Sequence, residues 1–298
     1  MQKIKYSILL LILSFSIPSF SEQVKSRVIE NGGTGKYSAI MMTENTLPTH
    51  TVFRPENIKK FKGKKSLPLI VWGNGACFDS PFEHVNFLNE IASHGFLVIA
   101  IGTLPKETGE QNKERSTSSK LTAAIDWAIA QNSDTKSIYF KKINTQKIAV
   151  AGMSCGGLQA LEVAGDPRIS TLVVANSGIF IDPIRGNAMP MMPQLDKTHL
   201  KKIHTPTLYL LGGPSDIAYN NGMNDVENIN HVPVFVGNMD AGHGGTYGQA
   251  FGGEYARVAT AWFKWQLKGD KKAGQLFTGN PPALSKSPGW TVDKKNMK

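Results

Sequence analysis

The sequence contains little cysteine and lacks the patterns by which proteins hold metals or nucleotides. Its 298 residues include two cysteines, Cys77 and Cys155, and two cysteines alone cannot make a structural zinc site. The histidines are dispersed, no His-Glu-x-x-His pattern occurs, and no Walker or dinucleotide glycine pattern follows the first strand. We therefore predict no metal site and no nucleotide cofactor.

An apolar run long enough to cross a membrane is also missing. The apolar stretch Ile8–Ile17 is too short to span a bilayer. It follows Lys3 and Lys5 and precedes Ser19-Phe20-Ser21, which places small residues three and one positions before a cut after Ser21. This arrangement predicts a cleaved secretory signal over residues 1–21 and a secreted or periplasmic protein without a stable membrane anchor. An uncleaved anchor is the alternative interpretation.

The chain is basic, with a formal net charge of +10 that falls to +8 once Lys3 and Lys5 are removed. Much of the excess lies in the lysines between residues 59 and 65 and in the tail from Lys271. Such lysines are most simply a solvated surface, although they also suit an acidic polymer or an anionic envelope. Nothing resembles a nucleic-acid-binding module, so no nucleic-acid partner is predicted. The sequence indicates no particular oligomeric state.

Strands and helices alternate along one domain, predicted over residues 22–298, with its core over about 37–268 and a polar tail over 269–298 that wraps the surface. Continuous apolar runs such as Leu67–Trp72 and Phe96–Ile101 are typical of buried parallel strands. The alternation predicts an α/β fold with a mostly parallel central sheet and helices on both faces. The other expected elements are a hairpin over Tyr37–Thr43 and His50–Phe53, strands over Ile148–Ala151, Thr171–Ala175, Thr207–Leu211 and Val232–Val236, and helices over Val85–Ser93, Ser116–Gln131 and Glu254–Leu267.

The pentapeptide Gly152–Gly156, with the sequence Gly-Met-Ser-Cys-Gly, joins the strand over Ile148–Ala151 to a helix over 157–164. A serine at the centre of such a sharp strand-to-helix turn takes a strained backbone conformation that lifts its Oγ clear of the sheet. Side chains two positions before and after it would collide with the turn, so glycine is needed at 152 and 156. The pattern therefore predicts Ser154 as a catalytic nucleophile.

Two further residues complete a set of catalytic candidates. Asp216 follows the 207–211 strand and His243 follows the 232–236 strand, and the carboxyl ends of parallel strands meet at one edge of a sheet. In this interpretation His243 takes the proton of Ser154, and Asp216 holds the imidazole tautomer. Asp182, which follows the 171–175 strand, is the competing acid. Asp240 lies too near His243 in sequence to reach behind its ring.

An oxyanion formed at Ser154 needs backbone N–H donors. We expect one from Cys155, at the start of a helix, and one from the loop over 73–77, where Asn74 is the first choice and Gly75 the second. Donors that converge on one oxygen bring Cys77 close to Cys155. In an oxidising compartment this predicts a Cys77–Cys155 disulfide. Two buried thiols that serve as small apolar residues are the alternative.

The turn and the Ser, Asp, His order along the chain resemble the α/β-hydrolase superfamily. No cap insertion separates the 171–175 and 207–211 strands, and in this the chain resembles the dienelactone-hydrolase and cutinase-like polyester-hydrolase branch of the superfamily. The segment Ile91–Phe96, which leads into the strand over Phe96–Ile101, is also similar to that branch. The resemblance covers roughly residues 65–268. It departs at position 153, where Met replaces the family's frequent His, Trp or Tyr, and at Trp72–Gly75, where many esterases carry a His-Gly-Gly loop.

This resemblance implies hydrolysis of carboxylic esters without a cofactor, in an open cleft that accepts small or polymer-bound esters. The predicted substrate-binding residues are Trp72, Gly75, Phe78 and Met153, with Phe180 and Tyr247 as further wall residues, although any of these bulky side chains would equally suit a core. Two other hypotheses remain. The first is a peptidase or amidase that uses the same triad. The second is a catalytically silent protein that binds wall polysaccharide.

Overall fold

The computed structural model describes residues 25–106, 109, 111–182 and 192–297. The predicted signal peptide, residues 1–21, lies outside this part of the chain. No helix within the described ranges combines the length and the apolar character needed to cross a membrane.

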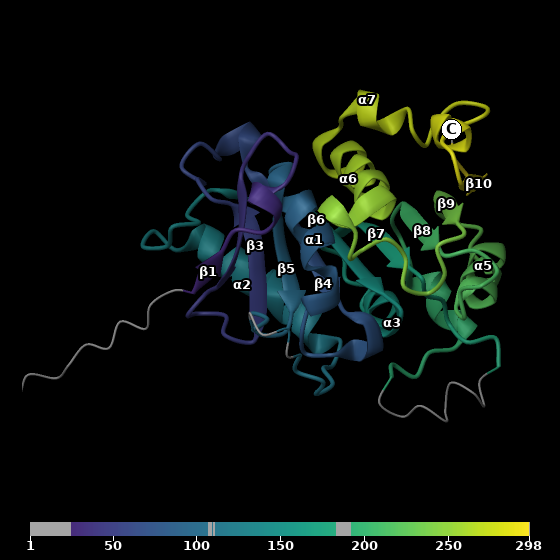
Figure 1. Cartoon of the computed structure of the whole chain (residues 1–298), viewed down its shortest axis with the longest axis horizontal. Helices are drawn as coiled ribbons and strands as arrows, with labels where there is room; N and C mark the ends of the chain where they lie inside the picture. The colour runs from purple at the N-terminus through teal and green to yellow at the C-terminus, as the bar shows by residue number, and fades with distance from the viewer. Residues whose placement is uncertain (1–24, 107–108, 110, 183–191, 298) are drawn as a thin grey trace, which may run out of the picture.

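The centre of the molecule is one sheet to which ten described strands contribute, in the order β1-β2-β3-β5-β4-β6-β7-β8-β9-β10. The six strands from β5 to β9 in this order are parallel, and the pairs at the two ends are antiparallel. Figure 1 shows the strands running through the middle of the molecule between helices. The strands are β1 (Ser26–Arg27), β2 (Ala39–Thr43), β3 (His50–Pro55), β4 (Leu67–Gly73), β5 (Leu97–Ile101), β6 (Ile143–Met153), β7 (Ile169–Ala175), β8 (Thr207–Leu211), β9 (Val234–Met239) and β10 (Trp290–Lys295).

Helices cover both faces of the sheet because its central strands are apolar on both sides. In β4, Leu69 and Val71 belong to one core cluster, and Ile70 and Trp72 belong to another, as expected when successive side chains alternate across a strand. The first cluster includes residues of α2 (Ser119–Ser133), α3 (Cys155–Glu162) and α5 (Tyr219–Asn228). The second includes residues of α1 (Val85–Ser93) and α6 (Gly253–Lys268), which lie side by side. The short helix α7 (Lys271–Gly274) follows α6 along the chain.

The predicted α/β architecture is confirmed, and most expected elements coincide with observed ones. β8 and α1 have the predicted bounds, whereas β6 begins five residues earlier than expected, at Ile143. Residues 144–147 are polar and partly exposed, so they carry no apolar signal although they continue the strand. Helix α5 was not predicted, because its sequence is rich in asparagine and contains a glycine, residues that favour helices weakly.

The tail after Gly269 differs from its prediction as a surface wrap. Phe277, Leu284 and Trp290 are buried in the core cluster that contains α1 and α6, and β10 pairs with β9 along its whole length. The tail looks polar because the solvent-facing side chains of an edge strand are lysine, aspartate and threonine. Its few apolar residues are therefore structural, and the tail belongs to the folded unit.

This role of the tail predicts a large loss of stability from a single truncation. Trp290 is buried against Tyr255, and its Nε1 donates a hydrogen bond to Glu254 Oε2 at 2.8 Å. Trp290→Ala should lower the free energy of unfolding by about 3–5 kcal/mol, measured by chemical denaturation. Asp293→Ala, at an exposed position of the same strand, is the matched control and should change it by less than about 0.5 kcal/mol. Equal, small effects would show that β10 is not part of the cooperative fold.

Candidate active site

The turn between β6 and α3 places Ser154 in the conformation that its sequence pattern predicts. Ser154 has φ 53° and ψ −120°, a combination that L-residues seldom adopt and that the surroundings must hold in place. Its N–H donates to Ala175 O at 2.9 Å, and its carbonyl accepts from Ser177 Oγ at 2.7 Å. A Cβ on Gly152 would lie 2.1 Å from Gly156 O. Any side chain at position 152 would therefore clash with the backbone of Gly156, which explains the glycine that the sequence pattern of the turn requires.

His243 lies between Ser154 and Asp216 within hydrogen-bond reach of both. Its Nε2 is 2.9 Å from Ser154 Oγ, and its Nδ1 is 2.6 Å from Asp216 Oδ1. A carboxylate only accepts, so Nδ1 carries the proton and Nε2 is free to accept from the serine hydroxyl. Both ring nitrogens are thus engaged, and neither remains for the competing acid Asp182. Asp240 instead accepts a hydrogen bond from Ser215 Oγ at 3.0 Å.

Asp216 is buried, yet it is held in its charged form. Burial acts to raise the pKa of its carboxyl, but hydrogen bonds from His243, from the Ala218 N–H and from Asn176 outweigh burial and keep the pKa below its ordinary value. The two oxygens share these donors. Oδ1 accepts from His243 and from Ala218 N at 2.9 Å, while Oδ2 accepts from Asn176 Nδ2 at 2.9 Å and from Gly212 N at 3.2 Å.

The loop after β4 lies against the start of α3, as expected for the second oxyanion donor. A Cβ on Gly156 would lie 2.1 Å from Gly73 C and 2.6 Å from Asn74 N, so the two backbones are in direct contact. Cys77 and Cys155 form the predicted disulfide, with their Cα atoms 5.1 Å apart. The side chain of Asn74 is engaged within the loop. Its Nδ2 donates to Phe78 O at 2.9 Å and Ile101 O at 2.7 Å and braces the loop from within.

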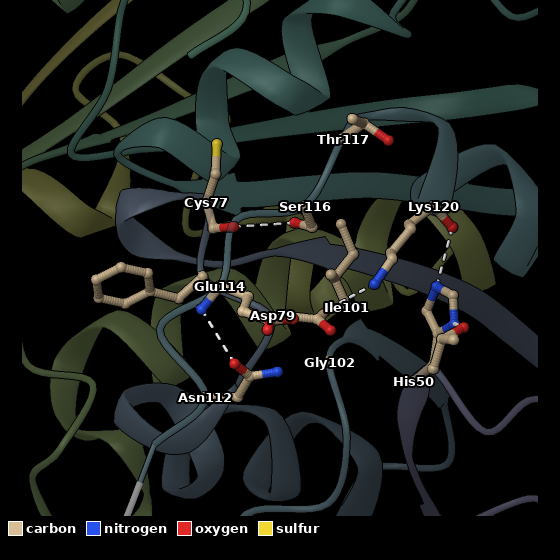
Figure 2. Close-up of polar contacts among 12 residues, drawn as sticks. His50, Cys77, Asp79, Ile101, Gly102, Asn112, Glu114, Ser116, Thr117 and Lys120 are labelled. Carbon is tan, nitrogen blue, oxygen red and sulfur yellow. Dashed lines mark hydrogen bonds and ion pairs between the residues drawn. The ribbon is translucent and has the colours of Figure 1, made fainter. Parts of the chain in front are cut away.

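Polar contacts from Ser116, just before α2, and from Lys120 in its first turn hold this loop and the residues after it (Figure 2). Ser116 donates to Cys77 O through both its N–H, at 2.9 Å, and its Oγ, at 3.0 Å. Lys120 forms an ion pair with Asp79 at 2.6 Å. Gln159 of α3 in turn donates to Ser116 O at 2.9 Å. The loop turns through two left-handed residues, Ala76 at φ 51° and Cys77 at φ 54°, and these contacts stabilise that turn.

A cavity of about 100 Å³ opens beside Ser154 and His243. Its polar wall comes from Asn176, Ser177 and Asn221, and its apolar wall is formed by Leu158, Phe180, Met192, Ile217 and Ala218. Ile217 is 73% exposed, and Ile181, in the loop of Phe180, is 52% exposed. An exposed apolar rim of this kind suits an apolar ligand better than a charged one.

Most of the predicted wall residues do not line this cavity. Trp72, Gly75, Phe78 and Met153 are absent from it, whereas Phe180 is present. Trp72 is 1% exposed and packs against His84, Phe87 and Tyr247 in an aromatic cluster, so its assignment to substrate binding is wrong. Both faces of β4 are covered by core side chains, and an apolar run alone does not reveal that this burial extends to Trp72. Tyr247 is likewise buried, as part of that cluster.

Two features of the site escaped prediction although a signal for each was present. Asn176 directly follows β7, at the same sheet edge as Asp216 and His243, so the rule that identified those residues also points to it. Ile217 directly follows Asp216 in the sequence, so its place beside the candidate acid could have been inferred.

A larger cavity of about 860 Å³, between α1, α6 and α7, includes none of the three triad candidates. Within the described residues, no group of three or more His, Cys, Asp or Glu side chains is placed to hold a metal ion.

The sheet order, the turn at Ser154 and the loops at the carboxyl ends of the parallel strands define an α/β-hydrolase fold. The family model described as PETase, PET hydrolase-like, matches residues 78–289, more than two thirds of the chain. The chain belongs to this family, a polyester-hydrolase branch of the superfamily, and it is an ester hydrolase of the α/β-hydrolase type. The resemblance to that branch is therefore confirmed. Among curated proteins, none matches the sequence.

The disulfide beside Ser154 gives a test of how the loop after β4 is held. It closes a loop with a sequence separation of 78, so in the chain-entropy picture its removal should cost about 4 kcal/mol of stability. We expect Cys77→Ser, or reduction, to lower the melting temperature and also to reduce ester turnover, because the loop beside Ser154 becomes free to shift.

Ser116→Ala is the matched control, since it removes one donor to the same loop and leaves the disulfide intact. It should have a clearly smaller effect on the melting temperature. Mass spectrometry of the non-reduced protein should find no free thiol. Two thiols that alkylate readily in the native protein would contradict the assigned bond.

Proposed function

We propose that this protein is an exported serine hydrolase that cleaves carboxylic esters through Ser154, His243 and Asp216. The observation that supports the proposal most directly is the continuous chain of hydrogen bonds from Ser154 Oγ through both nitrogens of His243 to the buried carboxylate of Asp216. This chain lies at the wall of a cavity with an apolar rim, where the ester group of a substrate has access to the serine.

The reaction proceeds in two halves. Ser154 Oγ attacks the ester carbonyl while His243 Nε2 takes its proton, and the tetrahedral intermediate collapses when His243 returns that proton to the leaving alcohol. Water then repeats the sequence on the acyl-enzyme, with His243 again as base and then acid. Asp216 keeps the Nδ1–H tautomer and stabilises the imidazolium that forms in each half.

Backbone N–H groups stabilise the oxyanion in this proposal. The Cys155 amide supplies one hydrogen bond from the N-terminus of α3, where the helix dipole also favours negative charge. The loop after β4 supplies the second, through the amide of Asn74 or Gly75. The disulfide and the Ser116 contacts hold that loop against α3 before substrate arrives, so little reorganisation is needed during the reaction.

The proposed substrate is an ester with apolar groups, including esters within a polymer. Leu158, Phe180, Met192 and Ile217 form an apolar wall beside Ser154, and the family match is to polyester hydrolases. The exposure of Ile217 and Ile181 places apolar surface at the rim, where a long chain would contact it. The cavity itself is small, so we expect it to hold one short acyl or alcohol segment while the rest of a polymer lies outside.

We further propose that the protein is exported and works as a single domain over residues 22–298 after removal of residues 1–21. The disulfide supports export, because such bonds persist in oxidising compartments.

The experiment that identifies the substrate is a panel of p-nitrophenyl esters of rising chain length, acetylated and feruloylated glycans, a polyester film and peptide amides. Faster cleavage of amides than esters would favour a peptidase. No turnover of any member would favour a binding protein.

The role of Ser154 predicts a loss of activity without a loss of fold. Ser154→Ala should lower ester turnover by several orders of magnitude, since triad members act as a unit, while the melting temperature stays close to that of the wild type because alanine keeps the Cβ and removes only the hydroxyl. The measurement is initial-rate kinetics on a p-nitrophenyl ester. Retention of most of the activity would exclude Ser154 as the nucleophile.

The role of Asp216 predicts a distinct pattern among three acidic residues. Asp216→Asn should reduce turnover by roughly 10³–10⁴-fold, because an amide favours the wrong imidazole tautomer. Asp182→Asn and Asp240→Asn are the matched controls and should change turnover far less. A large loss at Asp182 with a small loss at Asp216 would transfer the role of the acid to the loop after β7.

A further inference from the structure

Asn176 occupies the junction of the loops that carry the candidate acid and base. It directly follows β7, is fully buried, and adopts a left-handed backbone conformation with φ 44°. Its N–H donates to Leu210 O at 2.7 Å, which fixes its backbone against β8. A buried asparagine with positive φ needs a specific set of partners, and its side chain has them.

The Asn176 side chain bonds to three separate parts of the chain. Its Nδ2 donates to Asp216 Oδ2 at 2.9 Å and to Gly242 O at 3.1 Å, directly before His243. Its Oδ1 accepts from Tyr247 Oη at 2.6 Å. A flipped amide would place Oδ1 against a carboxylate and a carbonyl, which only accept. The amide orientation is therefore set by its surroundings.

The backbone around this amide is packed closely enough to exclude another arrangement. A Cβ on Gly212 would lie 2.7 Å from Asn176 Nδ2 and 2.1 Å from Gly242 O. Gly242 N also donates to Gly212 O at 2.8 Å. The loop of Asp216 and the loop of His243 therefore meet at Gly212 and Gly242, and the amide of Asn176 closes their junction with one hydrogen bond to each loop.

We infer that Asn176 is a positioning residue for the triad, an inference that rests on the proposed function. One amide N–H holds Asp216 Oδ2, which turns Oδ1 toward His243 Nδ1. The other holds the carbonyl beside His243, which fixes the distance between acid and base. Both imidazole nitrogens bond to Asp216 and Ser154, so Asn176 acts on the reaction through the geometry and charge of Asp216. Tyr247 fixes the orientation of the amide.

Asn176→Leu tests the loss of this donor. Hydrogen bonds to charged groups are worth about 1.5–3 kcal/mol, so kcat should fall by roughly 10-fold to 100-fold. KM should change by less than about threefold, because Asn176 is fully buried and its amide is bonded to the protein itself. If Asn176→Leu does not fold, the isosteric Asn176→Asp tests the same role, because it preserves the shape of the side chain and replaces the amide donor by an acid.

The pH dependence of Asn176→Asp is the decisive measurement. Two adjacent carboxyls do not ionise together easily, so at low pH the introduced carboxyl is protonated, and its single O–H donates to Asp216 in place of one amide N–H. At high pH it is ionised and repels Asp216. The ratio of wild-type to variant kcat/KM should therefore rise at least tenfold between pH 6 and pH 9. Tyr247→Phe, which adds no titratable group, is the matched control, and its ratio should not vary with pH.

A ratio that does not depend on pH, or a folded Asn176→Leu variant that keeps the wild-type kcat, would overturn the inference. The proposed function is tested separately by Ser154→Ala on the same substrate. Ser154-dependent turnover together with a flat ratio for Asn176→Asp would remove the positioning role alone. Turnover that survives Ser154→Ala would remove the proposed function itself.

Discussion

The close contact of three backbone segments around Ser154 is the constraint on which the rest of the site depends. The end of β4, the end of β6 and the start of α3 approach within distances that no Cβ could occupy at Gly152 or Gly156. This contact supports the strained serine and brings the loop after β4 to the helix N-terminus. The disulfide and the Ser116 hydrogen bonds then secure an arrangement that backbone packing has already set.

The parallel sheet supplies the second requirement, which is that distant parts of the chain end at one edge. β6, β7, β8 and β9 are neighbours, and each delivers one polar residue just beyond its end or in the loop that follows. Those residues are Ser154, Asn176, Asp216 and His243. Burial of the Asp216 carboxylate is unfavourable by itself, and four donors around its two oxygens offset that penalty. The polar network and the sheet order are therefore interdependent.

The parallel strands of the sheet and the convergence of Ser154, His243 and Asp216 at its edge could be predicted from the sequence, because both leave local signals. The apolar run Leu67–Trp72 marks a buried strand, and glycines two residues on either side of Ser154 mark its turn. β10 left a weak signal because only Trp290 and the partly buried Val292 of this edge strand pack against the core. α5 forms from a sequence with low helix propensity, and tertiary contacts hold it, since Asp225 accepts from Ile179 N at 2.9 Å and pairs with Lys197 at 2.6 Å.

The walls of the site were harder to predict than its chemistry. An aromatic residue at a strand end fits a cleft and a core equally well by composition, and only packing decides that Trp72 is buried while Ile217 is exposed. The hydrogen-bond partners of the Asn176 side chain lie 40, 66 and 71 positions away in the sequence. No short sequence motif can therefore contain both Asn176 and its partners. Contacts of this range follow from how the loops meet, which the sequence does not specify locally.

The central claim is that this packing produces one activated serine, and covalent labelling tests it most directly. The protein is treated with a fluorophosphonate, and the modified peptide is identified by mass spectrometry, with His243→Ala as the comparison. The account predicts a single adduct on Ser154 that forms far more slowly in the variant, because the imidazole no longer takes the serine proton. An adduct on another residue, or no adduct in the wild-type protein, would contradict it.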